Sequence, residues 1–156
     1  MTEFLEILKL LASAAVGSLA FALFFCTQTK RCIPSMLGGL LAGGAYILLI
    51  RFTGQEFLSN MTAAAVAMAY CEISARVTRA PTVIYIIPAI FPLVPGGALY
   101  YTISALASGN YNNALTHGKQ TVEIALGISC GLMLVSFIDS AVRKRKAKKA
   151  QVKAQP

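Results

Sequence analysis

The sequence predicts an all-α integral membrane protein of about five transmembrane helices, the fourth of them broken by proline and glycine. Hydrophobic residues make up 56% of the 156 residues and charged residues only 13%, with a mean hydropathy of +0.66. Soluble domains use about 45–50% apolar and about 25% charged residues. Charge is absent from residues 10–29, 32–50 and 80–118, and runs of about 18 or more apolar residues are long enough to cross a bilayer as a helix.

The first two spans are expected at about residues 5–25 and 35–52. Glu3 and Glu6 precede the first apolar run, whereas a secretory signal peptide opens with basic residues, so we interpret this run as a retained span. Lys30 and Arg31 mark the loop that follows, and Pro34 suits the start of the second helix.

The third and last spans are expected at about 57–77 and 116–140, with a polar connector at 108–113. Two pairs of opposite charge lie four residues apart, on one helix face each, near the ends of these spans. The pairs are Glu72 with Arg76, and Asp139 with Arg143. Their expected role is to anchor the helices at the membrane edge.

The fourth span, about 81–107, has to break. It carries three prolines and then two glycines, and no uninterrupted helix tolerates that series. Because proline removes backbone donors, carbonyl groups are left without helical partners, and such backbone persists in a membrane where it lines a cavity or is buried in protein. The broken segment is therefore the predicted substrate-binding site, formed by Pro92, Pro95, Gly96, Gly97 and Tyr100. The alternative is a kink that only shapes helix packing.

The chain is expected to consist of a membrane domain at 1–142 and a basic, disordered cytoplasmic tail at 143–156. The distribution of basic residues predicts the orientation of the membrane domain. Seven of the fourteen Lys and Arg residues lie in this tail, where they fix orientation or contact anionic lipid rather than nucleic acid. Five crossings place the N-terminus outside, with eleven basic residues inside and three outside. If the broken segment is instead a re-entrant loop, four crossings give nine inside and five outside.

Glu123 is the most interior acid and the candidate for carrying a coupling proton, since ionisable residues within a membrane face a partner, a cavity or an ion pathway. The alternative is an ion pair with Lys119, one turn away. Helix packing is expected at three pairs of small residues spaced by four. These pairs are Ser13 with Gly17, Gly39 with Gly43, and Gly127 with Gly131.

Signatures of catalysis and of metal binding are missing, so the expectation is a protein that is not an enzyme and has neither cofactor nor metal. His117 is the only histidine and lies just after the polar connector. The four cysteines form no CxxC pair and predict neither a metal site nor a disulfide. They are Cys26, Cys32, Cys71 and Cys130.

The segment 81–100 resembles the threonine/serine exporter family, specifically its small subunit of the C-terminal type. It carries P-x-x-x-P-L-V-P-G-G, from Pro88 to Gly97, followed by Tyr100 and preceded by Pro81. The resemblance implies export of threonine and serine, or of small dicarboxylates, across a bacterial inner membrane, driven by an ion gradient. It also implies a partner, a larger homologous membrane subunit.

Two other functions remain open from the sequence. One is a scaffold subunit that stabilises a membrane complex without contacting substrate. The other is a homo-oligomeric channel whose proline–glycine break forms a constriction lined by carbonyl groups. Uphill, gradient-dependent transport would argue against the channel.

Overall fold

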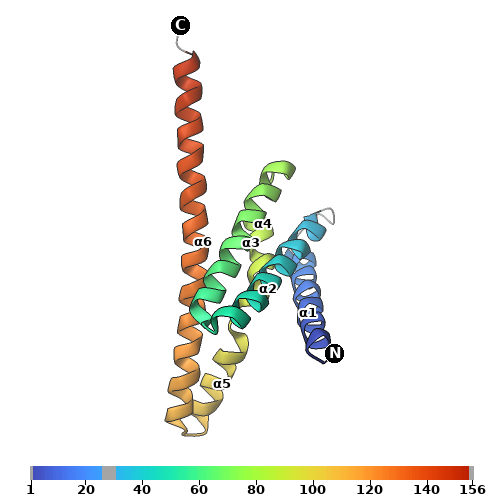
Figure 1. Cartoon of the computed structure of the whole chain (residues 1–156), viewed down its shortest axis with the longest axis vertical. Coiled ribbons are helices and arrows are strands. Elements are labelled where there is room, and N and C mark those ends of the chain that lie inside the picture. Colours follow the sequence, from blue (N-terminus) through green and yellow to red (C-terminus); the bar gives the residue numbers. More distant parts are fainter. Residues whose placement is uncertain (1, 26–30, 155–156) are drawn as a thin grey trace.

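The computed structural model describes residues 2–25 and 31–154, with side chains from 4 to 25 and from 31 to 145. This part of the chain is helical, without strands (Figure 1). In order, its elements are α1 (Thr2–Phe25), α2 (Cys32–Thr53), α3 (Glu56–Thr78), α4 (Val83–Ile90), the short 3-10 turn η2 (Phe91–Leu93), α5 (Gly96–Ala107) and α6 (Tyr111–Ala154). Cys26, and Lys30 of the expected first loop, lie outside the described residues.

The last helix differs from its prediction at both ends. It begins at Tyr111 rather than near residue 116, because the Asn110 side chain accepts a hydrogen bond from the backbone N–H of Asn113 at 3.3 Å and so caps the helix. At the other end α6 continues through Ala154, where a disordered tail from residue 143 was expected. The tail is rich in Ala, Lys and Arg, all of which favour helix.

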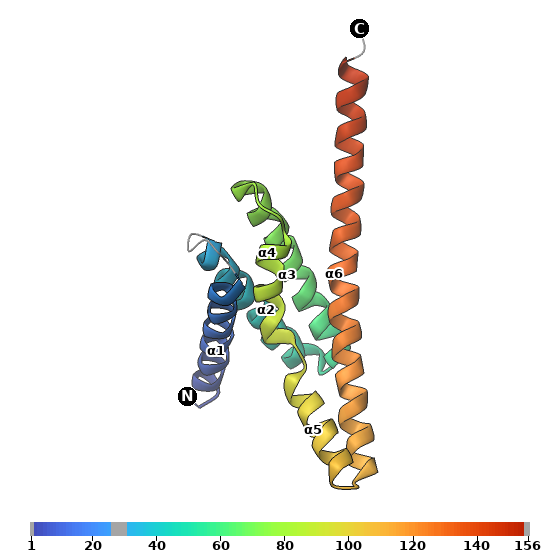
Figure 2. The same ribbon diagram turned by 180° about the vertical axis from the view of Figure 1, so that it is seen from behind.

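Helix α3 lies at the centre of the arrangement and packs against α2, α4 and α6. Helix α1 packs on α2 and α4, whereas α5 packs on α6 and extends beyond the other helices (Figures 1 and 2). Small side chains occupy the centre of this assembly, and most large apolar ones face outward, as expected where lipid replaces water. The fully buried alanines are Ala22, Ala42, Ala63, Ala64, Ala67 and Ala89.

Three of the described helical segments are long and apolar enough to cross a membrane alone, Phe4–Phe25, Cys32–Thr53 and Tyr111–Arg145. The bent pair Val83–Leu93 and Gly96–Ala107 makes a fourth if its two arms form one span. Helix α3, the remaining predicted span, has 23 residues but is rich in alanine and carries charged residues near both ends. Its position among α2, α4 and α6 explains how it tolerates a less apolar composition than a helix that faces lipid.

The expected close packing is confirmed for two of the three pairs of small residues, whereas a Cβ atom on Gly17 would make only an ordinary contact, 3.5 Å, with the Phe91 ring. A Cβ atom on Gly39 would overlap the Ser18 hydroxyl, and one on Gly43 would lie 3.0 Å from the Cβ of Ala14, so these glycines let α2 approach α1. On α6, a Cβ atom on Gly127 would lie 2.6 Å from the Phe57 carbonyl oxygen of α3.

Helices α3 and α6 run in the same direction. Phe57 lies against Gly127 near the start of α3, and Glu72 lies against Arg143 near its end, so residue numbers increase together along both helices. The α4–α5 pair between them therefore carries the chain back along the whole length of α3. This course favours the predicted crossing over a loop whose two ends lie at the same level.

Candidate functional site

Proline shapes the break between α4 and α5. Pro88 is fully buried inside α4, and Pro92 lies in η2, where the backbone tightens so that the Val94 N–H donates to the Phe91 carbonyl oxygen at 3.2 Å. The chain is then extended at Val94 before α5 starts at Gly96. The two helical arms are bent by 53° at this point.

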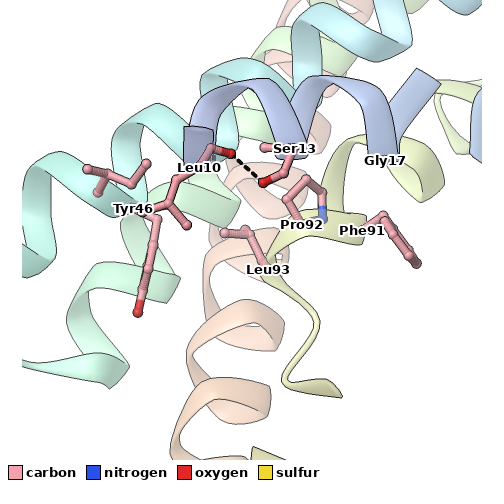
Figure 3. Close-up of a pocket in the computed structure, with 10 residues that line it drawn as sticks. Leu10, Ser13, Gly17, Tyr46, Phe91, Pro92 and Leu93 are labelled. Atoms are coloured by element: carbon pink, nitrogen blue, oxygen red, sulfur yellow. Dashed lines mark hydrogen bonds between the residues drawn. The ribbon is translucent and has the colours of Figure 1, made fainter. Parts of the chain in front are cut away.

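A cavity of about 210 Å³ lies on the inner side of the break, between η2, α1 and α2 (Figure 3). Its walls are largely apolar, and Ala14, Gly17 and Gly43 leave the space because they are small. Its residues are Leu10, Ser13, Ala14, Gly17, Gly43, Tyr46, Ile47, Phe91, Pro92 and Leu93. A largely apolar cavity with a few polar groups is the usual form of a small-molecule site.

Two contacts hold Ser13 and Phe91, which both line the cavity, in place. The Ser13 hydroxyl donates to the Leu10 carbonyl oxygen of its own helix at 2.8 Å. The ring of Phe91 stacks on Phe21 of α1, with centroids 3.9 Å apart. The broken segment is therefore held against α1 at the edge of the cavity.

Tyr46 connects the cavity to a cluster of polar side chains at the junction of α2, α3 and α6. Its ring lines the cavity, and Figure 3 shows its hydroxyl directed away from Ser13 and Pro92. That hydroxyl donates to Oε2 of Glu56 at 3.1 Å, and the Gln120 amide of α6 donates to Oε1 at 3.3 Å. Asn60 donates to the backbone oxygen of Glu56 at 2.8 Å and to Oε2 at 3.4 Å. We call Tyr46, Glu56, Asn60 and Gln120 the polar cluster.

An ion-pair network joins α3 to α6 at the opposite end of α3. Arg143 contacts Glu72 at 2.9 Å and Asp139 at 2.5 Å, and Arg76 contacts the same two carboxylates. Both carboxylate side chains are only 12% exposed. The two helical pairs expected at the membrane edge therefore form one network, which ties the two helices together.

The predicted site residues do not gather in one pocket. Pro92 lines the cavity, whereas Gly96 and Gly97 face open space, with nothing within 4 Å of an added Cβ atom. Tyr100 is 66% exposed. Helix α5, as a whole, has no buried residue.

Glu123 is paired with Lys119 at 3.7 Å, and its side chain is 43% exposed. It does not line the cavity. Glu123 nevertheless lies at the same height as the break. Thr102 of α5 packs against Gly118 of the antiparallel α6, and both helices rise by about 1.5 Å per residue. Gly97 and Glu123 are each five residues from that contact.

Sequence analysis missed Glu56. In the sequence it stands two residues after Gly54 at the start of an apolar helix, where an acidic residue is expected simply because it complements the helix dipole. Its contact with Gln120 joins residues 64 positions apart. The sequence therefore identifies Glu56 as an acid at the end of a span, but it does not identify the side chains that Glu56 contacts.

Apolar helices around a broken helix, with a small cavity at the break, are the features of a multi-pass membrane protein. Within the described residues, no group of three or more His, Cys, Asp or Glu side chains is placed to hold a metal ion. The family model described as "Threonine/Serine exporter, ThrE" matches residues 10–138, and the chain belongs to this family. No curated protein and no solved structure matches the chain. The family is one of transporters, so the chain is of the exporter type.

Proposed function

We propose that this chain is a subunit of a secondary-active exporter of threonine and serine, or of small dicarboxylates, in a bacterial inner membrane. The observation that carries this proposal is the cavity at the helix break, since Phe91, Pro92 and Leu93 of the family-like segment form one of its walls. A cavity of about 210 Å³ suits a solute the size of a small amino acid rather than a large one.

The first turn of α5 is the proposed contact for a substrate carboxylate. The first N–H groups of a helix have no intrahelical acceptor, and the positive end of the helix dipole favours an anionic group. Gly96 and Gly97 leave this turn sterically open. The Gly96 N–H already donates to the Val94 carbonyl oxygen at 2.7 Å, so the N–H groups of Gly97 and Ala98 are the proposed donors. Pro95 sets the direction of the turn, and Tyr100 lies one turn further on.

The partner is proposed to be a larger homologous membrane subunit. A solute path needs walls on all sides, and here α5 has no buried residue while the glycines of the break face open space. A second set of helices against this face would close the path. The orientation proposed with it has the N-terminus outside and the C-terminus cytoplasmic, as the basic residues predict.

Efflux of labelled threonine, serine and succinate tests the proposal in cells that express the chain alone, or with the partner. The cavity-blocking variant is Ser13→Leu, because Ser13 lines the cavity. Its matched control is Ser129→Leu, since Ser129 is also an exposed helical serine whose hydroxyl donates to a carbonyl oxygen of its own helix, here Ala125 at 2.8 Å. A third variant is Gly96→Leu, at a position where nothing lies within 4 Å of an added Cβ atom.

Gradient-driven efflux that needs the partner, and that Ser13→Leu and Gly96→Leu abolish in assembled complexes, is the expected result. Efflux from the chain alone would indicate a homo-oligomer, and passive flux without coupling would indicate a channel. Undiminished efflux in both variants would indicate that the chain is a scaffold subunit that does not contact the substrate. Membrane levels and co-purification with the partner are measured for each variant.

Proton coupling is proposed at a carboxylate near the break, and two residues compete for this role. Glu56 is the stronger candidate from its contacts, because the polar cluster joins it to the cavity through Tyr46. Glu123 is the other, level with Gly97 but paired with Lys119. If Glu56 carries the coupling proton, Glu56→Gln abolishes uphill, protonophore-sensitive efflux, because glutamine cannot take up and release a proton, while exchange of substrate persists.

Comparison of Glu56→Gln with Glu123→Gln, each with and without a protonophore, decides between the two. Loss of protonophore-sensitive efflux in Glu123→Gln alone would transfer the role to Glu123. Normal uphill efflux in both variants would remove both residues from the coupling mechanism.

A further inference from the structure

An open pocket of about 420 Å³ lies at the charged end of the molecule, far along α3 from the polar cluster. It is formed where α3 ends, the chain turns through residues 80–82 into α4, and α6 passes alongside. Three arginines line it, Arg76, Arg79 and Arg143, together with Thr82.

The pocket carries an excess of positive charge. Arg76 and Arg143 share two carboxylates, Glu72 and Asp139, whereas Arg79 has no carboxylate partner within the described part of the chain. Each guanidinium has five N–H donors, so the contacts with the carboxylates orient Arg76 and Arg143 without using all of their donors. Arginine presents these donors in a fork that matches phosphate oxygens.

The walls of the pocket are braced. The Thr78 hydroxyl lies 2.7 Å from that of Tyr85, whose side chain is fully buried in α4, so the turn is held to both helices. At the C-cap of α3, Arg79 adopts the left-handed conformation, with φ +52°, and its backbone N–H contacts the carbonyl oxygens of Ala75 and Arg76. The three arginines therefore project from backbone whose course is fixed.

The pocket lies where the apolar stretch of α6 ends, which is the expected level of lipid headgroups. Asp139 ends the apolar stretch of α6, and from Arg143 onward the helix is basic. Apolar side chains lie beside the pocket residues in the chain, since Val77 follows Arg76 and is 79% exposed, and Val83 follows Thr82 and is 59% exposed. Here cations lie next to apolar side chains that are expected to face lipid. This arrangement suits a molecule that has both a phosphate group and acyl chains.

We infer that this pocket binds the headgroup phosphate of an anionic phospholipid, with Arg79 as the principal contact and Arg76, Arg143 and Thr82 as supporting ones. The binding site is separate from the transport cavity and does not depend on the proposed substrate. It would dock α3, α4 and α6 to one leaflet through a single lipid.

Native mass spectrometry of the purified full chain, titrated with phosphatidylglycerol or phosphatidylcholine, tests this inference. Arg79→Gln should weaken binding of the first phosphatidylglycerol by about tenfold or more, since a hydrogen bond between two charged groups is lost. The matched control is Arg145→Gln, which removes the same charge from the same end of the molecule but lies outside the pocket. Its expected loss is at most about twofold, because exposed charges are screened within roughly 10 Å.

Arg79→Lys and inorganic phosphate complete the test. The lysine variant keeps the charge and should recover part of the affinity, which a loss of folding would not allow. Equal losses in Arg79→Gln and Arg145→Gln would overturn the inference in favour of a diffuse basic surface, as would equal binding of the two lipids. Binding of inorganic phosphate alone, dependent on Arg79 and unaffected by lipid, would assign the pocket to a free anion instead.

Discussion

Glycines 127 and 131 allow α6 to lie directly against the backbone of α3. A Cβ atom on Gly131 would overlap the Met61 carbonyl oxygen and lie 3.0 Å from the Cβ of Ala64. In a membrane, where lipid is as apolar as the side chains, such close contact is a main source of helix association. These two glycines therefore hold the longest helix to the centre of the molecule.

Gly131→Ala should destabilise the protein by about 1–3 kcal/mol or more, because an added methyl group at a filled contact forces backbones apart. The control is Gly97→Ala, which meets no atom within 4 Å. It should be neutral or slightly stabilising, since alanine favours helix by about 1 kcal/mol over glycine. Thermal unfolding in detergent measures both variants. An equal melting temperature for the two would show that α3 and α6 do not pack as described.

The polar cluster shows why the sequence located only part of the candidate site. Local spacing indicated Pro92, which lines the cavity, because a proline series in an apolar run breaks any helix. Tyr46 and Glu56 gave no comparable signal, since each looks ordinary in its own helix. Their importance comes from contacts with Gln120 and with the wall formed by α1 and η2, and an apolar helix has no polar face from which such neighbours could be predicted.

At the scale of elements, the predicted spans and the break agree with the structure, whereas the ends of α6 do not. Apolar length determines where a helix crosses a membrane, so spans at 5–25 and 35–52 could be placed from composition. The start and end of α6 depend instead on a cap at Asn110 and on the helix-forming residues of the tail. Both segments are polar and were therefore expected to be loops. Polarity excludes a residue from lipid, but it does not exclude a residue from a helix.

The exposed face of α5 should be in contact with water or with the partner rather than with lipid. In a background without the four native cysteines, we expect Gly97→Cys to react with a water-soluble maleimide, because this position is open and lies at the break. Met133→Cys is the matched position, because Met133 is 76% exposed in the apolar stretch of α6; we expect it to face lipid and not to react. Protection of Gly97→Cys by threonine would further support the site. Similar reactivity at both positions would mean that the break faces no aqueous path.

At the scale of the whole molecule, the parallel course of α3 and α6 supports the prediction of five crossings, in which α3 is also a span. Two parallel helices that both span the membrane must be separated by a crossing in the opposite direction, and only the α4–α5 pair lies between them. The same conclusion follows independently from the distribution of basic residues, which is more unequal for five crossings than for four. An odd number of crossings also gives two consecutive homologous halves opposite orientations, as in inverted repeats.

Labelling of single cysteines in intact cells tests this topology. With five crossings, Gln55→Cys and Asn110→Cys both lie outside and should react with a membrane-impermeant maleimide, whereas Pro81→Cys should react only after permeabilisation. The three positions are exposed, in the turns that follow α2, α5 and α3 respectively. With four crossings, Pro81 and Asn110 would react from outside and Gln55 would be protected. That pattern is incompatible with parallel α3 and α6. Gln55 directly precedes α3 and Asn110 directly precedes α6, so the two residues lie on the same side of the membrane if the two helices cross it in the same direction.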